Sequence, residues 1–305
     1  MSSNITIKNL RKTYGPFVAV DDVSIEIREG CVYGLLGPNG AGKTTTFKCL
    51  LGLVRPSSGT LQIGGEPIAP ATFERLAYVP ERSVLYDWMT VAEHVEMNRR
   101  AFRGFSVKVA RDLLHQFNID PRKKTRNLSK GMRTATMVAL AIGRQADILV
   151  LDEPTSGLDP INQRHVLNLI INESARGATV IFSSHQIGQV ERAAERIAVI
   201  DRGRLALEGE VEDLKAGRKI VEAVFPNEEF SLNGIATDNR ALRVDRTGRI
   251  VRVLTADGAS DFVHRLEAMG GTGVRIVDLN LEDIFLYAVS PADSTVAAIV
   301  EGTPQ

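Results

Sequence analysis

The sequence predicts an α/β fold, in which a mostly parallel sheet is covered by helices and followed by a small α+β domain. Two observations predict this class. Between about residues 129 and 200, short apolar runs alternate regularly with segments of helical periodicity, which is typical of strand–helix units in a parallel sheet. A near-continuous apolar run at residues 31–36 ends in a glycine-rich turn, as expected of a buried strand that feeds a loop.

The first part of the chain alternates strands and helices around one insertion. We expect strands at 23–27, 31–36, 60–63 and 76–79 and a helix at 44–53. Residues 90–117 change to helical spacing, and a polar, basic connector follows at 118–127, which indicates a helical insertion. Helices at 129–142, 161–171 and 187–194 then alternate with strands at 147–151, 178–182 and 197–200.

The pattern changes after about residue 214. Strands are expected at 219–225, 241–245, 250–254 and 274–277, and helices at 261–269 and 281–288. We therefore predict a first domain over 1–217, with a helical subdomain at about 85–127, and a small α+β domain over 218–289. The residues from 290 to 305 are mostly small or polar and are expected to form a frayed tail.

Composition excludes several classes of protein. The chain has 305 residues, of which 44% are hydrophobic and 6% aromatic, so global disorder, collagen and low-complexity sequence are excluded. The 37 Lys+Arg are balanced by 37 Asp+Glu, which argues against long-range attraction to nucleic acid or anionic lipid. No nucleic-acid partner is therefore expected.

The two cysteines and the apolar runs indicate where the protein works. Cys31 and Cys49 have neither zinc-site spacing nor a disulfide framework, so we expect two buried thiols in a reducing compartment. Residues 1–12 lack the apolar core of a signal peptide. The longest apolar runs, such as 148–151, fall far short of the about 18 residues of a spanning helix. The chain is not expected to cross a membrane by itself.

The sharpest motif is the run Gly-Pro-Asn-Gly-Ala-Gly-Lys-Thr at residues 37–44, which fits G-x-x-x-x-G-K-[ST] between a predicted strand and a predicted helix. Glycines let backbone N–H groups surround phosphates, and the following helix points its positive end at them. Lys43 would supply a charge to the outer phosphates, and the Thr44 hydroxyl could bind Mg²⁺. The alternative, a flexible glycine turn, does not account for the strand and helix around it.

Two further motifs carry acids and a hydroxyl. The apolar run 148–151 ends in Asp152 and Glu153, placed to hold the Mg²⁺ shell and to polarise the attacking water. An acid that caps the next turn is the alternative. Ser129 is a plausible N-cap, and with Gly131 and the helix N-terminus it could form a second anion site. From this segment alone, a plain capped helix is the better explanation of Ser129.

Taken together, the motifs resemble the ATP-binding cassette (ABC) ATPases, P-loop proteins that bind ATP with Mg²⁺. The resemblance covers about residues 4–215 and rests on motifs that occur in one order. They are the phosphate loop, Tyr78-Val79-Pro80-Glu81, Leu128-Ser129-Lys130-Gly131-Met132, Asp152-Glu153, Ser156-Gly157-Leu158-Asp159 and Ser183-Ser184-His185.

The resemblance implies roles for particular residues. Glu153 resembles the catalytic base, His185 the switch histidine that contacts the γ-phosphate, and Asp159 the loop aspartate at a dimer interface. Tyr14 is similar to the aromatic that stacks on adenine, with a surface tyrosine as the alternative. The residues implied to contact nucleotide are Tyr14, Gly37, Pro38, Asn39, Gly40, Ala41, Gly42, Lys43, Thr44, Thr45, Ser129 and Gly131.

This chain departs from the family pattern in two motifs. The signature usually reads Leu-Ser-Gly-Gly-Gln, but Lys130 replaces a glycine and Met132 the glutamine. Glu81 stands where the family usually has a glutamine that senses Mg²⁺ and the attacking water. A carboxylate there could bind Mg²⁺ together with Thr44 and Asp152, and it would repel the γ-phosphate when the metal is absent.

The resemblance also implies partners and a location. Two cassettes sandwich two ATP molecules head to tail in this family, so a second ABC subunit, identical or related, is expected. The helical subdomain corresponds to the face that docks an integral membrane permease, and Tyr86, Trp88 and Met89 either line that groove or form a buried cluster. Residues 280–287 resemble the ending of single-cassette subunits of bacterial drug- and lipid-type exporters.

The leading interpretation is an ATP-binding and hydrolysing subunit that powers an ABC exporter from the cytoplasmic face of the membrane. Two alternatives stay open. One is a soluble ABC ATPase that acts on ribosomes or nucleic acid, although such relatives usually have tandem cassettes, long coiled-coil insertions or basic segments. The other is a nucleotide sensor without useful turnover, which only Glu81 and the altered signature favour.

Overall fold

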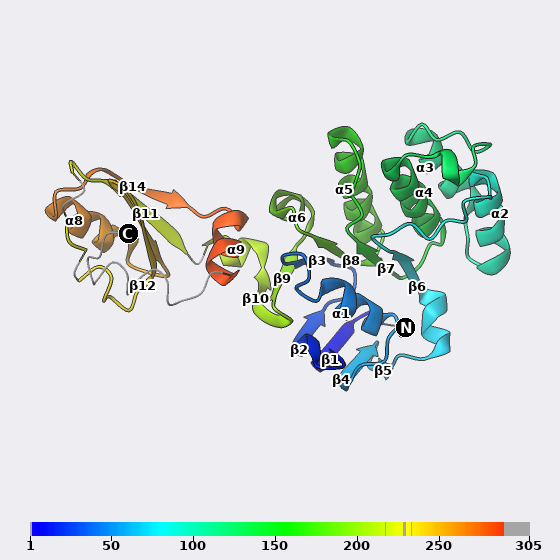
Figure 1. Cartoon of the computed structure of the whole chain (residues 1–305), viewed down its shortest axis with the longest axis horizontal. Coiled ribbons are helices and arrows are strands. Elements are labelled where there is room, and N and C mark those ends of the chain that lie inside the picture. The colour runs from blue at the N-terminus through cyan, green and yellow to red at the C-terminus, as the bar shows by residue number, and fades with distance from the viewer. Residues whose placement is uncertain (1, 217, 228–229, 233, 290–305) are drawn as a thin grey trace. The chain divides into compact units, whose positions relative to one another are not determined.

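The computed structural model describes residues 2–216, 218–227, 230–232 and 234–289. The chain divides into two compact units, Met1–Glu208 and Gly209–Gln305. Figure 1 labels the helices and strands of both units, and each unit is described by itself below.

The first unit contains a six-stranded sheet in the order β10-β9-β3-β8-β7-β6. The strands are β3 (Val32–Leu36), β6 (Leu76–Val79), β7 (Ile148–Asp152), β8 (Thr179–Ser184), β9 (Arg196–Asp201) and β10 (Arg204–Glu210). β3 pairs in parallel with β8 and β9, and β7 pairs in parallel with β6 and β8. Because Leu36 is opposite Ser184 and Asp152 is opposite Ser183, the loops that follow these strands emerge at one edge.

A second, antiparallel sheet in this unit has the order β2-β1-β4-β5. It contains β1 (Ile5–Tyr14), β2 (Phe17–Ile27), β4 (Ser58–Ile63) and β5 (Glu66–Pro67). Side chains from both sheets form one apolar core with helix α1 (Lys43–Leu50), in which Phe47 and Leu50 are buried. This core fixes the start of α1 against the central strand β3.

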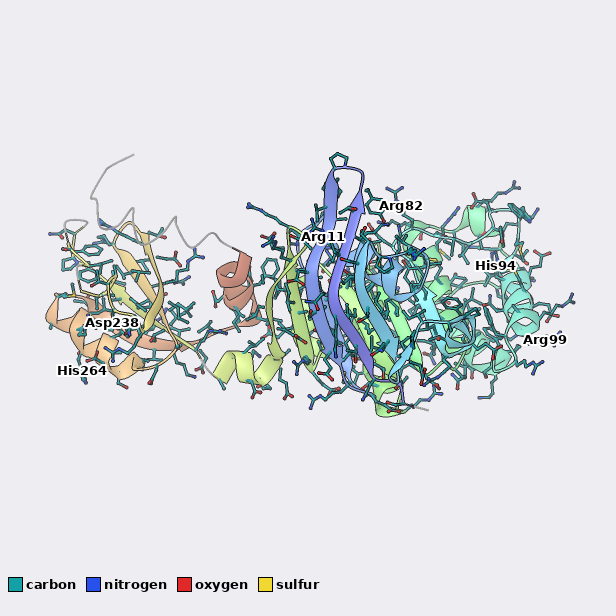
Figure 2. All side chains as sticks on the ribbon, turned by 90° about the horizontal axis from the view of Figure 1, so that it is seen from below. Arg11, Arg82, His94, Arg99, Asp238 and His264 are labelled. Atoms are coloured by element: carbon teal, nitrogen blue, oxygen red, sulfur yellow. The ribbon has the colours of Figure 1, made fainter. Side chains whose placement is uncertain are left out.

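Helices cover the parallel sheet and form the predicted insertion. They are α2 (Val91–Ala101), α3 (Val107–Gln116), α4 (Lys130–Gly143), α5 (Pro160–Ala175) and α6 (Ile187–Ala193), with short 3₁₀ turns at η1 (Pro70–Arg75) and η2 (Thr125–Asn127). In Figure 1, α2 and α3 lie beside α4, as expected of a helical subdomain. Figure 2 shows His94 and Arg99 on this insertion. No helix in the described residues is long and apolar enough to span a bilayer.

The second unit is built on a four-stranded antiparallel sheet in the order β12-β13-β11-β14. Its elements are α7 (Val211–Ala216), β11 (Lys219–Val224), β12 (Ala241–Thr247), β13 (Ile250–Thr255), α8 (Ala259–Ala268), β14 (Thr272–Asp278) and α9 (Leu281–Val289). Phe262 and Leu266 of α8 are buried with Val221 and Val253 of the sheet. The predicted tail, 290–305, lies outside the described residues.

The structure adds strands that the sequence pattern did not indicate. β1 carries polar residues at Lys8 and Asn9, and its pairing with β2 shifts register between Ile7 and Leu10, so it lacks a regular alternation. β10 has no fully buried run. The helix predicted at 44–53 ends at Leu50, and Gly52 follows with φ +64°, a conformation that does not continue a helix.

Candidate functional site

The phosphate loop connects β3 to α1 and depends on its glycines. Gly42 has φ +113°, and a Cβ atom there would lie 2.6 Å from the carbonyl oxygen of Ala19. Only glycine fits this position without strain. Because Gly42 is also the N-cap of α1 and offers no side-chain cap, the first backbone N–H groups of the helix are left for another acceptor.

Lys43 is the buried cation of this loop. Its Nζ donates hydrogen bonds to the carbonyl oxygens of Gly37, at 2.7 Å, and Pro38, at 3.2 Å. Burial lowers the pKa of the Lys43 ammonium, and the carboxylates of Glu153, Asp152 and Glu81 oppose that shift. The ammonium is therefore held at the loop, close to three acids.

Asp152 connects the loop to the ends of the central strands. Thr44 Oγ1 donates to Asp152 Oδ2 at 2.7 Å, and Ser183 Oγ donates to Asp152 Oδ1 at 2.6 Å. A hydroxyl and a carboxylate at one point are the ligands that Mg²⁺ takes when substrate phosphates and water complete its shell. The described residues hold no group of three or more His, Cys, Asp or Glu side chains that could bind a metal ion by themselves.

Glu153 combines an uncommon backbone conformation with a buried side-chain oxygen that lacks a hydrogen-bond partner. Its φ of +51° is uncommon for a residue with a side chain, and its N–H donates to Ser183 Oγ at 3.0 Å. Its Oε2 lies 2.9 Å from His185 Nδ1, and its Oε1 lies 3.8 Å from Lys43 Nζ. Within the described ranges, Oε1 is the one buried side-chain nitrogen or oxygen atom without a hydrogen-bond partner. A ligand or a water molecule would satisfy this atom.

These groups surround a cavity of about 370 Å³. It is lined by Phe17, Ala19, Asn39, Gly40, Ala41, Gly42, Lys43, Thr44, Thr45, Glu81, Asp152 and Glu153. The volume lies within the usual range for small-molecule sites, about 300 to 1,000 Å³. The structure thus brings together the phosphate loop, the two acids after β7 and Glu81. His185 joins them through Glu153, and Gly37 and Pro38 through Lys43.

Glu81 affects its neighbours through its charge. Burial raises the pKa of Tyr78 far above its ordinary value, and the carboxylates of Asp152 and Glu81 add to that shift. The same Glu81 carboxylate acts on Lys43 in the opposite sense, because it favours the charged ammonium. Its place in the cavity wall therefore puts a third negative charge beside the phosphate loop.

Tyr14 does not line this cavity in the described structure, whereas Phe17 does. The two residues face each other across the hairpin that joins β1 to β2, and the Phe17 side chain is 62% exposed. Lys12 Nζ lies 4.9 Å from the centre of the Tyr14 ring. Sequence reasoning missed Phe17, although the pair Gly15-Pro16 between two aromatic residues was a signal for a tight hairpin.

Ser129 and Gly131 also lie away from the cavity lining. Ser129 is the exposed N-cap of α4, and its Oγ accepts the N–H of Met132 at 3.2 Å. Gly131 is buried, and a Cβ atom there would lie 2.4 Å from the carbonyl oxygen of Gly157. Within this chain, Gly131 allows α4 to approach the loop that follows Glu153.

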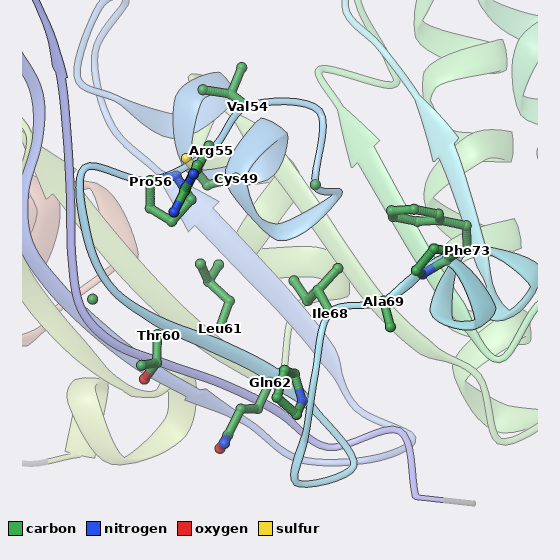
Figure 3. Close-up of a pocket in the computed structure, with 14 residues that line it drawn as sticks. Cys49, Val54, Arg55, Pro56, Thr60, Leu61, Gln62, Ile68, Ala69 and Phe73 are labelled. Atoms are coloured by element: carbon green, nitrogen blue, oxygen red, sulfur yellow. The ribbon is translucent and has the colours of Figure 1, made fainter.

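A second cavity of about 440 Å³ lies elsewhere in the first unit, where Val54, Leu61, Ile68 and Phe73 contribute apolar side chains (Figure 3). Arg55 is the one charged residue among the described residues of its wall. No acid or phosphate-loop residue contributes to it. Residues of the sequence motifs therefore line the cavity beside the phosphate loop and not this one.

Comparisons with known proteins agree with the interpretation of the motifs. The family described as "ABC transporter" matches residues 20–156, and a domain described as "AAA domain, putative AbiEii toxin, Type IV TA system" matches residues 124–190. A Nod factor export ATP-binding protein I of Cupriavidus metallidurans is 35% identical over 297 residues, which covers 94% of this chain and 97% of that protein. An uncharacterised ABC transporter ATP-binding protein of Bacillus subtilis is 34% identical over 69% of this chain and 72% of its own length.

Solved structures agree on the fold. An ATP-binding subunit of an ABC transporter superposes with a TM-score of 0.64 at 29% identity, over 70% of this chain and 92% of that one. A dimeric post-hydrolysis ATP-binding cassette bound to ADP and Pi gives 0.62 at 24% identity, over 68% of this chain and 98% of that one, and shows the fold alone. The chain belongs to the ABC transporter family as an ATP-binding subunit, a nucleotide-binding ATPase with the P-loop α/β fold.

Proposed function

We propose that this subunit powers a membrane exporter, with the cavity between the phosphate loop and Glu153 as its ATP-hydrolysing site. The unpartnered Glu153 Oε1 is the observation that carries the proposal, because it is a buried acceptor beside Lys43 and its neighbour oxygen is bound to His185. Export is favoured by relatives named Nod factor export ATP-binding protein I, which match the chain over nearly its full length.

The loop residues hold the nucleotide. Backbone N–H groups of residues 39–45 surround the phosphates at the start of α1, and Lys43 neutralises the outer ones. Phe17 lies at the cavity wall as an exposed ring that can stack on a base. Thr44 and Asp152 would hold Mg²⁺, and Glu81 would offer a further carboxylate. When bound, Mg²⁺ supplies positive charge to the phosphate oxygens.

Glu153 and His185 carry out the hydrolytic step. Glu153 Oε1 accepts a hydrogen bond from a water molecule and orients its oxygen toward the γ-phosphorus. As the water oxygen bonds to phosphorus, Glu153 takes up the water proton and the bond from phosphorus to the bridging oxygen breaks, which gives ADP and inorganic phosphate. His185, held by its Nδ1 on Glu153 Oε2, keeps its other ring nitrogen free for the γ-phosphate.

A second subunit completes the site. Ser129 is exposed and lies outside the cavity lining of its own chain, so it is available to an ATP molecule held by another subunit. Asp159, the N-cap of α5, and Gly131 hold the loops around this surface. Head-to-tail pairing of two cassettes would bring each Ser129 to the partner's phosphates, and separation after hydrolysis would produce movement.

The membrane partner docks on the helical insertion. Tyr86 and Trp88 are 46% and 67% exposed, and their rings lie 4.9 Å apart. The loop that carries them is fixed, because Thr125 Oγ1 donates to the carbonyl of Tyr86 and the Tyr86 N–H donates to His94 Nε2. An ordered, exposed aromatic pair suits a docking surface for a permease loop. The subunit would then lie peripherally on the cytoplasmic face of the membrane.

Two measurements test the proposal. Glu153→Gln should bind ATP but lose at least about a hundredfold in turnover, since the base contributes that much in comparable sites. A tagged chain, purified from gently solubilised membranes, should recover a multi-spanning protein in fixed ratio, and Trp88→Ala should reduce that recovery. Recovery with ribosomes or nucleic acid alone would reject the transporter assignment, and unchanged turnover in Glu153→Gln would place the base elsewhere.

A further inference from the structure

Gln189 lies at the centre of a buried network that connects the loops of Glu153 and His185. It is 8% exposed and sits in α6, four residues after His185. Its Oε1 accepts a hydrogen bond from Thr155 Oγ1 at 2.6 Å and from Ser184 Oγ at 3.3 Å. Thr155 is two residues beyond Glu153, and Ser184 directly precedes His185. One amide oxygen therefore holds both loops.

The other end of the Gln189 amide is also fully used. Nε2 donates to Gln186 Oε1 at 2.7 Å and to Gln163 Oε1 at 3.2 Å. Gln163, in α5, donates in turn to the carbonyl of Leu158 at 3.1 Å. The Gln189 side chain thus makes the four hydrogen bonds open to an amide, and the network contacts the loop 153–158 at Thr155 and at Leu158.

The network stabilises the loop in which Glu153 adopts a positive φ. A positive φ costs on the order of 1–3 kcal/mol and persists only where the surroundings enforce it. Ser183 fixes the N–H of Glu153 from the strand side. The Gln189 bond to Thr155 fixes the loop from its other side, and the bond to Ser184 sets the neighbouring turn that presents His185.

We propose that Gln189 is a positioning residue, which holds the loops of Glu153 and His185 so that the two side chains stay hydrogen-bonded to each other. The inference rests on the proposed roles of those two residues. Gln189 itself is not in the cavity lining, and none of its four side-chain hydrogen bonds goes to the phosphate loop. Its loss should therefore reduce the rate of hydrolysis and leave nucleotide binding nearly unchanged.

Gln189→Leu keeps most of the side-chain volume but removes all four hydrogen bonds. We expect kcat to fall at least about tenfold while KM for ATP changes less than about twofold. Gln189→Glu keeps both acceptor positions for Thr155 and Ser184, and the amide of Gln186 can turn to donate to it. That variant should recover most of the rate lost in Gln189→Leu.

Thr179→Val is the matched control, because Thr179 lies in the same strand as Ser184 but at its opposite end. Its Oγ1 is buried and bonds to Ser3 Oγ at 2.8 Å and to the Gly30 N–H at 3.0 Å. This variant should lower the melting temperature by as much as Gln189→Leu does and leave kcat unchanged. Equal losses of kcat in both variants would show a merely structural role and overturn the inference.

A double-mutant cycle with His185→Ala adds a test that does not depend on changes in protein stability, because it compares the loss of kcat in two backgrounds. If Gln189 acts through the Glu153–His185 pair, Gln189→Leu should lower kcat less than about twofold in the His185→Ala background. The inference would be overturned if the two losses of kcat were fully additive, or if Gln189→Leu had the kcat of the wild type. The proposed site would still stand in either case, provided that Glu153→Gln lost turnover. Turnover retained in Glu153→Gln would instead reject the proposed site, and this inference with it.

Discussion

At the scale of single residues, the aromatic residue of the cavity wall could not be identified from motif order alone. Tyr14 and Phe17 are both exposed and face each other across one hairpin, so either satisfies a pattern of an aromatic before the phosphate loop. The hairpin places Phe17 rather than Tyr14 in the cavity wall, and we therefore propose Phe17 as the stacking residue. Residues inside the motifs, such as Lys43, Asp152 and Glu153, needed no such information because their spacing fixes them.

Phe17→Ala should weaken ATP binding, whereas Tyr14→Ala should not. Stacking of a base on an aromatic ring is worth about 1–3 kcal/mol, so we expect an increase of about 5- to 160-fold in Kd for ATP with Phe17→Ala. Affinity for inorganic triphosphate should stay unchanged in both variants. Titration calorimetry with the two ligands measures this, and a larger loss with Tyr14→Ala would restore Tyr14 as the stacking residue.

Glu81 sets a second prediction at this scale. Its carboxylate lines the cavity and acts on both Lys43 and Tyr78, so it opposes phosphate charge when Mg²⁺ is absent. Glu81→Gln should therefore tighten binding of metal-free ATP several-fold, since a charge at cavity distance is worth about 1 kcal/mol or more. It should also raise the Mg²⁺ concentration that gives half-maximal turnover.

The control for Glu81 is Glu66→Gln, which removes the same charge from the exposed strand β5. That variant should reproduce neither effect when ATP affinity is measured with and without Mg²⁺. If Glu81→Gln leaves both metal-free affinity and Mg²⁺ dependence at wild-type values, the Glu81 carboxylate has no part in the metal site.

At the scale of elements, the strands that could be predicted from the sequence are those that are buried along most of their length. Strands β3, β7, β8 and β9 are buried along most of their length, so their apolar runs were visible in the sequence and their bounds agree within two residues. β1 and β10 are held by pairing to neighbours and alternate poorly, so no period marked them. Sheet order, which gathers the motif loops at one edge, is a long-range property that a single sequence does not carry.

Helix α2 offers a prediction about one element. Thr90 and Glu93 form a reciprocal capping box, in which Thr90 Oγ1 accepts the Glu93 N–H and Glu93 Oε2 accepts the Thr90 N–H. Thr90→Ala should lower the free energy of unfolding by about 1 kcal/mol in urea titrations. Ser106→Ala, which removes the one-sided cap of α3, should cost less.

The cost of Thr90→Ala should depend on pH. Hydrogen bonds from Thr90 lower the pKa of Glu93 below its ordinary value of 4.5. A lowered pKa in the folded state means that this contribution is fully present above pH 4.5 and is lost as pH falls through the lowered value. Thr90→Ala keeps the backbone N–H bond to Glu93, which is the larger cause, and removes the bond from the hydroxyl. The difference between wild type and Thr90→Ala should therefore narrow in acid by the part that the hydroxyl contributes. A difference that widened with falling pH would contradict the capping role of the Glu93 carboxylate.

At the scale of the whole molecule, the two units depend on different interactions. The first has its core around α1 and the two sheets, and it contains the cavity that we propose as the nucleotide site. The second has its own apolar core and a cluster of charges, in which Asp238 accepts hydrogen bonds from Arg240 and Arg265. These bonds hold the pKa of Asp238 well below its ordinary value. Stability of the second unit should thus respond to acid and that of the first to nucleotide.

Scanning calorimetry of the full chain should therefore resolve two transitions that respond separately. Mg²⁺ and ATP at a hundredfold excess over Kd should stabilise the first unit by about 2.7 kcal/mol and leave the second transition in place.

Asp238→Asn should lower only the second transition. Its effect should be largest above pH 3.8 and shrink as pH falls through the lowered pKa, because the protonated wild-type carboxyl loses the same bonds. Asp278→Asn, at an exposed ion pair with Lys219, should shift it much less. A single transition that moves with both nucleotide and Asp238→Asn would mean that the two cores unfold as one cooperative unit.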